Sequence, residues 1–309
     1  MLTLLLLVPI AAEHKALLLE RFRVLDAPDA ASRAAAIAAH GADVDLVLTN
    51  GATGFRADEI ALLPKLKLLA AQGAGYENLD LAAARARGVL TCNGAGTNDD
   101  CVADHAFGLL IGIVRDFRKL DRLCREGVWR DAIPQPANVS GKKLGILGLG
   151  TIGQKIAKRA AAFDMDVGYH NRKPREGATQ RYFGDLKALA NWADFLILAA
   201  PGGPATKHLV NAEVLDALGP QGYIVNIGRG SVVDTEALAA ALRENRIAGA
   251  GIDVYESEPK RPESLVGLDN VLLTPHLAGW SPEATQKSVD HFLANAEGHF
   301  AGRGVLTPI

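Results

Sequence analysis

The chain has 309 residues, of which 49% are hydrophobic, and a formal net charge of −2 at pH 7. This length predicts about two domains, and the nearly balanced charge excludes the basic surface of a nucleic-acid-binding or membrane-surface protein. The three cysteines, Cys92, Cys101 and Cys124, show no C-x-x-C spacing. We therefore expect reduced thiols in a cytoplasmic protein, and no apolar stretch is long enough to span a bilayer.

The first 91 residues alternate short apolar runs with helix-like segments. The runs lie at residues 4–8, 22–25, 44–48, 66–70 and 89–92. Alternation on this scale predicts a parallel sheet covered by helices. Residues 2–10 could also form the core of a signal peptide, but they lack a basic segment and contain Pro9, which favours a strand.

Residues 73–76, Gly-Ala-Gly-Tyr, directly follow the fourth predicted strand. Ligands bind at the carboxyl ends of parallel strands, where glycines can expose backbone N–H groups to an anion. A tight turn from strand to helix explains this segment equally well when it is considered alone.

A long apolar helix follows a linker at residues 94–98. Asn98 can cap this helix, and Asp99 and Asp100 favour its positive N-terminal end. The helix is predicted to run to about Arg125, and apolar residues on several of its faces predict burial in a core or between subunits. An irregular, proline-containing segment then leads to the next strand.

A glycine motif, G-x-G-x-x-G at residues 148–153, lies between an apolar strand at 144–147 and a helix that runs to 163. The glycines permit a tight turn, close approach of the backbone to a pyrophosphate and close helix–strand packing. The motif alone also fits an ordinary turn, but the strand before it and the helix after it favour dinucleotide binding. The residues expected at the pyrophosphate are Gly148, Gly150, Thr151, Ile152 and Gly153.

The alternation of strands and helices resumes after residue 163. Strands are predicted at residues 165–170, 195–199, 223–227, 250–253 and 271–273, which describes a second doubly wound unit. The last helix, at 282–300, has too few neighbours to form a domain, so we expect it to return to the N-terminal unit. The predicted domains are therefore 1–97 with 283–309, and 98–282.

The second strand of this unit ends at His170, where an NAD-specific fold places an Asp or Glu. Asn171, Arg172 and Lys173 follow instead. A carboxylate would repel a 2′-phosphate, whereas the two cations would attract one and Asn171 could donate a hydrogen bond. These four residues therefore predict that NADP(H) is preferred and NAD(H) is possible. A solvated basic turn is the alternative.

Three further polar residues follow strands of the second unit. They are Arg229, Glu258 and His276. Each could be an ordinary loop residue: an exposed arginine, a carboxylate before proline or a surface imidazole. Their combination at the carboxyl ends of one sheet, facing the expected cofactor crevice, suggests a catalytic site. The other histidines, including His105 and His208, are expected to be structural or surface groups.

From about residue 66 onward the chain resembles the D-isomer-specific 2-hydroxyacid dehydrogenases, which include the glyoxylate and hydroxypyruvate reductases. The matching motifs are GAGYENLD at 73–80, GLGTIG at 148–153, NIGRGSVVD at 226–234, GIDVYESEP at 251–259 and TPH at 274–276. The resemblance implies an α/β fold in which a Rossmann dinucleotide-binding domain is inserted in a flavodoxin-like substrate domain. It also implies a homodimer built largely through the inserted domain.

The resemblance assigns catalysis to Arg229, Glu258 and His276, and places Asp253 near the nicotinamide carboxamide. The chemistry agrees with these roles. Reduction of a 2-keto acid builds negative charge on the carbonyl oxygen, to which a protonated imidazole can donate a proton. A carboxylate on the far ring nitrogen orients the imidazole, and a guanidinium can grip the substrate carboxylate. We expect backbone amides at Ala74 and Gly75 to hold its other oxygen.

Other chemistries fit poorly, because the chain contains neither a G-x-S-x-G nucleophile motif nor an H-E-x-x-H metal motif. Together with the basic residues after His170, the resemblance implies an oxidoreductase that transfers a hydride from NADPH to glyoxylate or hydroxypyruvate to give the D-2-hydroxy acid. A reductase of larger keto acids, such as phenylpyruvates, is one alternative. A dinucleotide-sensing scaffold with little turnover is another.

Overall fold

The computed structural model describes all residues, 1–309, and divides into two compact units. The first unit comprises Met1–Asn98 and Trp280–Ile309, and the second comprises Asp99–Gly279. The chain thus leaves the first unit once and returns to it for its last helix. None of the helices combines the length and apolar character needed to cross a membrane.

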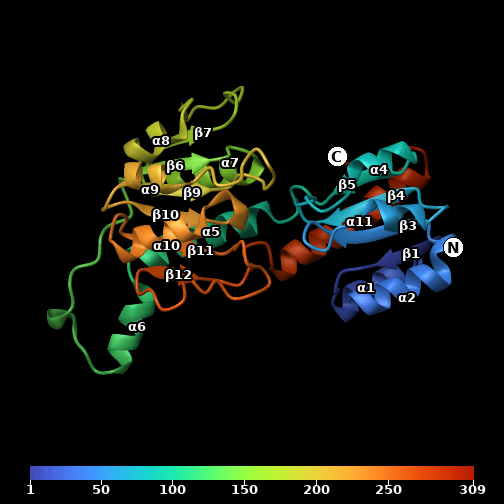
Figure 1. Ribbon diagram of the computed structural model, residues 1–309, viewed down its shortest axis with the longest axis horizontal. Coiled ribbons are helices and arrows are strands. Elements are labelled where there is room, and N and C mark those ends of the chain that lie inside the picture. The colour runs from blue at the N-terminus through green and yellow to red at the C-terminus, as the bar shows by residue number, and fades with distance from the viewer. The chain divides into compact units, whose positions relative to one another are not determined.

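The first unit is built on a five-stranded parallel sheet in the order β2-β1-β3-β4-β5 (Figure 1). Its strands are β1 (Thr3–Leu6), β2 (Arg23–Asp26), β3 (Leu46–Asn50), β4 (Leu68–Gln72) and β5 (Leu90–Asn93). Its helices are α1 (Ala12–Leu19), α2 (Ala30–His40), α3 (Ala57–Ala61), α4 (Leu81–Ala86) and α11 (Pro282–Phe300). The C-terminal helix α11 packs against α1 and β4 and completes this core.

The second unit is built on a seven-stranded parallel sheet in the order β12-β11-β10-β9-β6-β7-β8. Its strands are β6 (Lys143–Leu147), β7 (Asp166–His170), β8 (Arg181–Tyr182), β9 (Phe195–Leu198), β10 (Tyr223–Asn226), β11 (Gly249–Ile252) and β12 (Val271–Leu273). The central strands β6, β9, β10 and β11 are almost entirely buried because helices cover both faces of the sheet. Two parallel-sheet α/β units confirm the predicted fold class.

Two helices cover one face of the second sheet and three cover the other. On one side lie α5 (Asp99–Val114) and α7 (Thr151–Ala161), and on the other α8 (Leu186–Trp192), α9 (Ala212–Leu218) and α10 (Thr235–Arg243). Helix α5 approaches the sheet closely because glycines lie in β11. A Cβ built on Gly251 would lie 3.0 Å from Cβ of Leu109, and one on Gly249 would lie 3.1 Å from Ile113.

The prediction of one long helix that ends near Arg125 is wrong. The structure has two helices there, because Asp116 adopts a left-handed backbone conformation (φ 53°) that ends α5, and α6 (Phe117–Arg125) begins directly after it. No residue of α6 is buried. Figure 1 shows that α6 and the loop after it extend away from the seven-stranded sheet. The sequence analysis also missed β8, whose two residues are too few for a periodic pattern.

The close packing of α5 makes a stability prediction. Gly251→Ala should destabilise the protein by about 1–3 kcal/mol, because the new methyl group overpacks against Leu109. Gly184→Ala is the matched control, since a Cβ there meets only ordinary contacts at 3.9–4.0 Å from Tyr182. Urea unfolding of the two variants measures the difference. Equal stabilities would mean that the helix adjusts to the methyl group.

Candidate active site

Three neighbouring strands of the second sheet, β10, β11 and β12, end beside one another at the carboxyl edge. Arg229 lies in the loop after β10, Glu258 in the loop after β11 and His276 in the loop after β12. Parallel pairing brings all three loops to one edge, as the sequence positions predicted.

Glu258 and His276 form a carboxylate–imidazole pair. Oε2 of Glu258 lies 2.8 Å from Nδ1 of His276, and both side chains are partly exposed. The hydrogen bond that His276 donates to Glu258 raises the pKa of His276 above its ordinary value against the opposing effect of burial. Burial raises the pKa of Glu258, but hydrogen bonds from His276 and from the Tyr255 N–H outweigh it and leave this pKa low. The pair therefore favours a protonated imidazole beside an ionised carboxylate.

Arg229 lies close enough that its charge lowers the pKa of both His276 and Glu258. Its Nη1 donates to the Gly228 carbonyl at 2.7 Å, and Asn226 Nδ2 donates to the Arg229 carbonyl at 3.0 Å. The next residue must be glycine, because a Cβ on Gly230 would lie 2.0 Å from the carbonyl carbon of Tyr255. The arginine loop is thus pressed against the loop that carries Glu258.

Tyr255 connects the loops, and sequence reasoning missed it. Its backbone N–H donates to Oε1 of Glu258 at 2.7 Å. Its hydroxyl donates toward the carbonyl of Thr274 at 2.7 Å, with the Ile252 carbonyl at 2.9 Å. Burial raises the pKa of this hydroxyl to about 12, so it stays a donor. Its place inside the GIDVYESEP motif was the only sequence signal for it.

Asp253, expected near the nicotinamide carboxamide, is completely buried. Its carboxylate accepts hydrogen bonds from the backbone N–H groups of Leu277 and Ala278, at 2.8 and 2.9 Å, and from the Thr274 hydroxyl. Burial raises its pKa, but these bonds and the one from His105 outweigh that effect and hold the pKa below its usual range. In this structure Asp253 anchors the loop that carries His276.

The glycine motif has the shape of an anion cradle. Gly148 is left-handed (φ 97°), and a Cβ on Gly153 would lie 2.2 Å from the Gly148 carbonyl oxygen. Around Gly150, in contrast, a Cβ would meet nothing within 4 Å. Gly150 is also the N-cap of α7, so no side chain caps the N–H groups of Thr151, Ile152 and Gly153. Open space beside an uncapped helix N-terminus fits a dinucleotide pyrophosphate.

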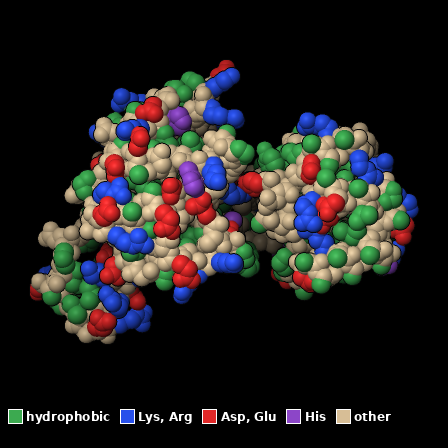
Figure 2. Space-filling model, viewed as in Figure 1, with side chains coloured by type: hydrophobic (Ala, Val, Ile, Leu, Met, Phe, Trp, Pro, Cys, Tyr) green, Lys and Arg blue, Asp and Glu red, His purple; other side chains and the backbone are tan.

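The end of β7 lies beside this cradle. Asn171 accepts a hydrogen bond from the Leu149 N–H at 2.8 Å, and His170 Nδ1 lies 2.9 Å from the Phe183 carbonyl oxygen. Arg172 and Lys173 are exposed in the protruding loop after β7, where Figure 2 shows Lys and Arg side chains.

Arg175, in the same loop, was missed by the sequence analysis. Its Nη1 reaches the Leu149 carbonyl at 3.3 Å, and its backbone N–H donates to the Tyr169 hydroxyl at 2.9 Å. The basic run Asn-Arg-Lys-Pro-Arg, if followed past the proline, would have included it. Arg175 therefore adds a third cation close to the glycine loop.

Ala74 and Gly75 lie in the first unit, in the loop after β4. The loop is held by Asn93 Nδ2, which donates to the Ala74 carbonyl at 2.8 Å, and by the Gly94 N–H, which donates to Gly73 at 2.7 Å. The backbone N–H groups of Ala74 and Gly75 donate to no backbone carbonyl. Their binding of an anion stays a prediction.

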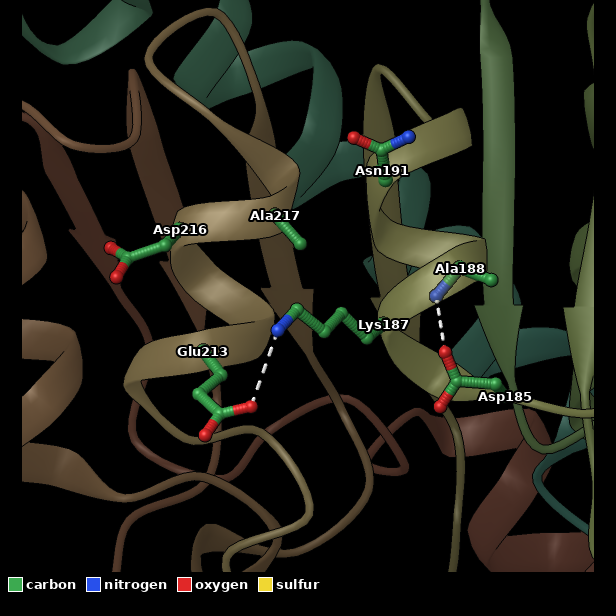
Figure 3. A pocket seen from close by; sticks show the side chains of 7 residues that line it. All are labelled: Asp185, Lys187, Ala188, Asn191, Glu213, Asp216 and Ala217. Carbon is green, nitrogen blue, oxygen red and sulfur yellow. Dashed lines mark hydrogen bonds and ion pairs between the residues drawn. The ribbon is translucent and has the colours of Figure 1, made fainter.

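A separate hollow of about 530 Å³ lies between α8 and α9 (Figure 3). Lys187 crosses it to pair with Glu213 at 3.3 Å, and Asp185 caps α8 through the Ala188 N–H. With Asp216 the hollow has three carboxylates against one ammonium group. This charge balance disfavours a dinucleotide or a 2-keto acid, so the hollow is not the active site.

Comparisons with known proteins agree with this geometry. Residues 107–278 match the family model described as D-isomer specific 2-hydroxyacid dehydrogenase, NAD binding domain. The chain is 39% identical over 274 residues to a hydroxyphenylpyruvate reductase of Plectranthus scutellarioides, and this alignment covers 88% of each protein. It is 36% identical over 291 residues to a glyoxylate/hydroxypyruvate reductase of Arabidopsis thaliana, covering 94% of this chain and 93% of the relative.

Among solved structures, the NADPH-dependent glyoxylate/hydroxypyruvate reductase of Sinorhizobium meliloti, in complex with NADP and malonate, superposes with a TM-score of 0.90. The two are 35% identical, and the match covers 100% of this chain and 96% of that chain. The family model matches more than half of the chain, and the relatives align over most of their length. The chain therefore belongs to the D-isomer specific 2-hydroxyacid dehydrogenase family.

Proposed function

We propose that this enzyme reduces glyoxylate and hydroxypyruvate to the D-2-hydroxy acids and prefers NADPH as the reductant. The observation that carries the proposal is the Glu258–His276 pair, 2.8 Å apart, with Arg229 in the neighbouring loop. A sensor scaffold has no need of a general acid. An imidazole kept protonated beside a fixed cation suits the reduction of a carbonyl group that carries an adjacent carboxylate.

Each side chain has a separate role in this proposal. His276 donates a proton from its outer ring nitrogen to the carbonyl oxygen, while Glu258 holds Nδ1 and stabilises the imidazolium. Arg229 binds the substrate carboxylate and polarises the carbonyl, and the N–H groups of Ala74 and Gly75 bind the other carboxylate oxygen. When bound, the nicotinamide supplies the hydride.

The dinucleotide would be held by the glycine loop and the N-terminus of α7. Gly148, Gly150, Thr151, Ile152 and Gly153 are its proposed pyrophosphate contacts. His170, Asn171, Arg172 and Lys173, joined by Arg175, are proposed around the 2′-phosphate, and Asp253 near the carboxamide. The NADP complex of the Sinorhizobium relative supports the choice of NADP(H), with NAD(H) possible.

Larger keto acids are the second candidate, because the Plectranthus relative is a hydroxyphenylpyruvate reductase. A panel of glyoxylate, hydroxypyruvate, phenylpyruvate and hydroxyphenylpyruvate with NADPH decides between the candidates. The highest kcat/KM on the two small acids supports the proposal. The highest value on an aromatic acid overturns it in favour of the second candidate.

We also propose that the enzyme is a cytoplasmic homodimer that pairs through the second unit. The arm that begins with α6 supports this proposal, because none of its helical residues is buried and Phe117 and Trp129 are 55% and 70% exposed. Exposed aromatic side chains of this kind are enriched in interfaces. The three free cysteines agree with a reducing compartment.

The role of His276 makes the first functional prediction. His276→Gln should lower kcat at least about 100-fold while the NADPH dissociation constant is kept, because the variant loses the proton donor but no cofactor contact. Steady-state kinetics and NADPH fluorescence titration measure the two constants. Near-normal turnover would remove His276 from the mechanism.

The paired carboxylate predicts a shift in the pH profile. Reduction needs the protonated imidazole, so kcat/KM falls as pH rises through the pKa of His276. Because Glu258 raises this pKa, Glu258→Gln should move the alkaline limb to lower pH. Glu256→Gln is the matched control, since its carboxylate pairs with His208 instead. A limb that stays in place in Glu258→Gln would mean that this carboxylate only fixes its loop.

Cofactor preference is predicted to depend on the basic loop after β7. Loss of one charge-assisted bond to the 2′-phosphate should lower the NADPH to NADH ratio of kcat/KM about 10- to 100-fold in Arg172→Ala, and similarly in Arg175→Ala. Lys187→Ala, in the hollow of the same unit, is the control cation. The prediction fails if the wild-type enzyme prefers NADH or if neither arginine variant changes the ratio.

A further inference from the structure

We propose that His105, on α5, is a positioning residue that holds His276 in its working conformation through Thr274 and Asp253. The proposal rests on the proposed role of His276 as proton donor. His105 does not belong to any motif that pointed to the catalytic site, and it lies on a different element from each of the three proposed catalytic residues.

The backbone of His276 is unusual. Its φ is 54°, in the left-handed region that a side chain other than glycine rarely adopts. Such a conformation persists only where the surroundings hold it in place, and it is concentrated at functional sites. Here the His276 N–H donates to the carbonyl oxygen of Asp253 at 2.8 Å and to that of Thr274 at 3.0 Å.

The carboxylate of Asp253 holds the chain on both sides of His276. On one side, the Thr274 hydroxyl donates to Oδ1 at 2.6 Å. On the other, the N–H groups of Leu277 and Ala278 donate to Oδ1 and Oδ2 at 2.8 and 2.9 Å. His276 is therefore held from both sides, because the residues before and after it bind the same buried carboxylate of Asp253.

His105 completes this network, and its proton can be assigned from the donors and acceptors present. Nε2 of His105 lies 2.9 Å from Oγ1 of Thr274 and 3.4 Å from Oδ1 of Asp253. The ionised carboxylate can only accept, so the single hydroxyl proton of Thr274 points to Asp253. Nε2 of His105 must then carry a proton and donate to Thr274. This bond fixes the hydroxyl and, through it, the start of the catalytic loop.

The position of His105 is set rigidly by α5. A Cβ on Gly251 of β11 would lie 3.0 Å from Leu109 of the helix, and one on Gly112 of the helix would lie 2.9 Å from Leu272 of β12. Helix α5 therefore touches β11 and β12 closely within two turns of His105. The imidazole donor is held by a packed helix, whereas the residue it supports lies in a loop.

The test compares His105→Leu with His105→Gln. The leucine variant should lower kcat about 10- to 100-fold because a loosened loop misplaces the proton donor. KM for the 2-keto acid and the NADPH dissociation constant should stay within about twofold, since Arg229 and the glycine loop are unchanged. His105→Gln should recover most of the turnover, because its amide can donate to Thr274. In the enzyme without cofactor, amide exchange at Leu277 and Ala278 should be faster in the leucine variant than in the glutamine variant.

A double-mutant cycle with Thr274→Val adds a second criterion. The two effects on kcat should be strongly non-additive, because each variant breaks the same chain of bonds. Asp104→Asn is the matched control, since this neighbour on α5 pairs with Arg159 at an exposed position.

Three outcomes would overturn the proposal: unchanged kcat in His105→Leu, equal kcat in the leucine and glutamine variants, or additive effects in the cycle. The His276→Gln variant tests the proposed function independently of the positioning role of His105. Retained turnover in His276→Gln rejects the general acid itself. Lost turnover in His276→Gln, together with normal His105→Leu, rejects only the positioning role.

Discussion

The buried carboxylate of Asp253 is the constraint on which the carboxyl edge around His276 depends. A buried charge is tolerated only when donors surround it, and here the donors are the Thr274 hydroxyl, which His105 holds, and two backbone N–H groups of the next loop. The requirement works in both directions. Asp253 needs these donors to remain ionised, and the loop needs the carboxylate to keep His276 left-handed. Burial of the Asp253 carboxylate is unfavourable by itself, and the hydrogen bonds that offset this cost also fix the backbone conformation of His276.

Helix ends explain where the second unit can receive an anion. In α8, α9 and α10 the first N–H groups are capped by side chains of Asp185, Asn211 and Asp234. In α7 the N-cap is Gly150, which offers no side chain. Of these four helices, only α7 lacks a side-chain cap, and its N-terminus meets open space beside Gly150. The same side-chain caps help to explain why the hollow between α8 and α9 offers no comparable site.

The sequence predicted those features that follow from local pattern and parallel topology. Buried strands and the glycine loop could be predicted from local pattern. The grouping of three polar residues at strand ends could also be predicted, because a parallel sheet places all carboxyl ends at one edge. Contacts between distant segments could not be read in this way. The contact of His105 with the loop that carries His276 depends on a helix that packs across the sheet. The break at Asp116 depends on a single left-handed residue, and Tyr255 acts partly through its backbone N–H.

The loop after β11 shows why residue type alone does not identify a catalytic pair. Two glutamates on this loop each bind a histidine: Glu258 lies 2.8 Å from His276, and Glu256 lies 2.7 Å from His208. Glu256 also accepts from the hydroxyl and the N–H of Thr235, at the start of α10, so its oxygens fasten a helix terminus. Glu258 lies near Arg229 of the neighbouring loop, whose charge lowers its pKa, and its imidazole partner His276 lies at the carboxyl edge of the sheet. The second pair is structural, because its carboxylate joins His208 to the start of α10. In the first pair, Glu258 binds His276 through Nδ1.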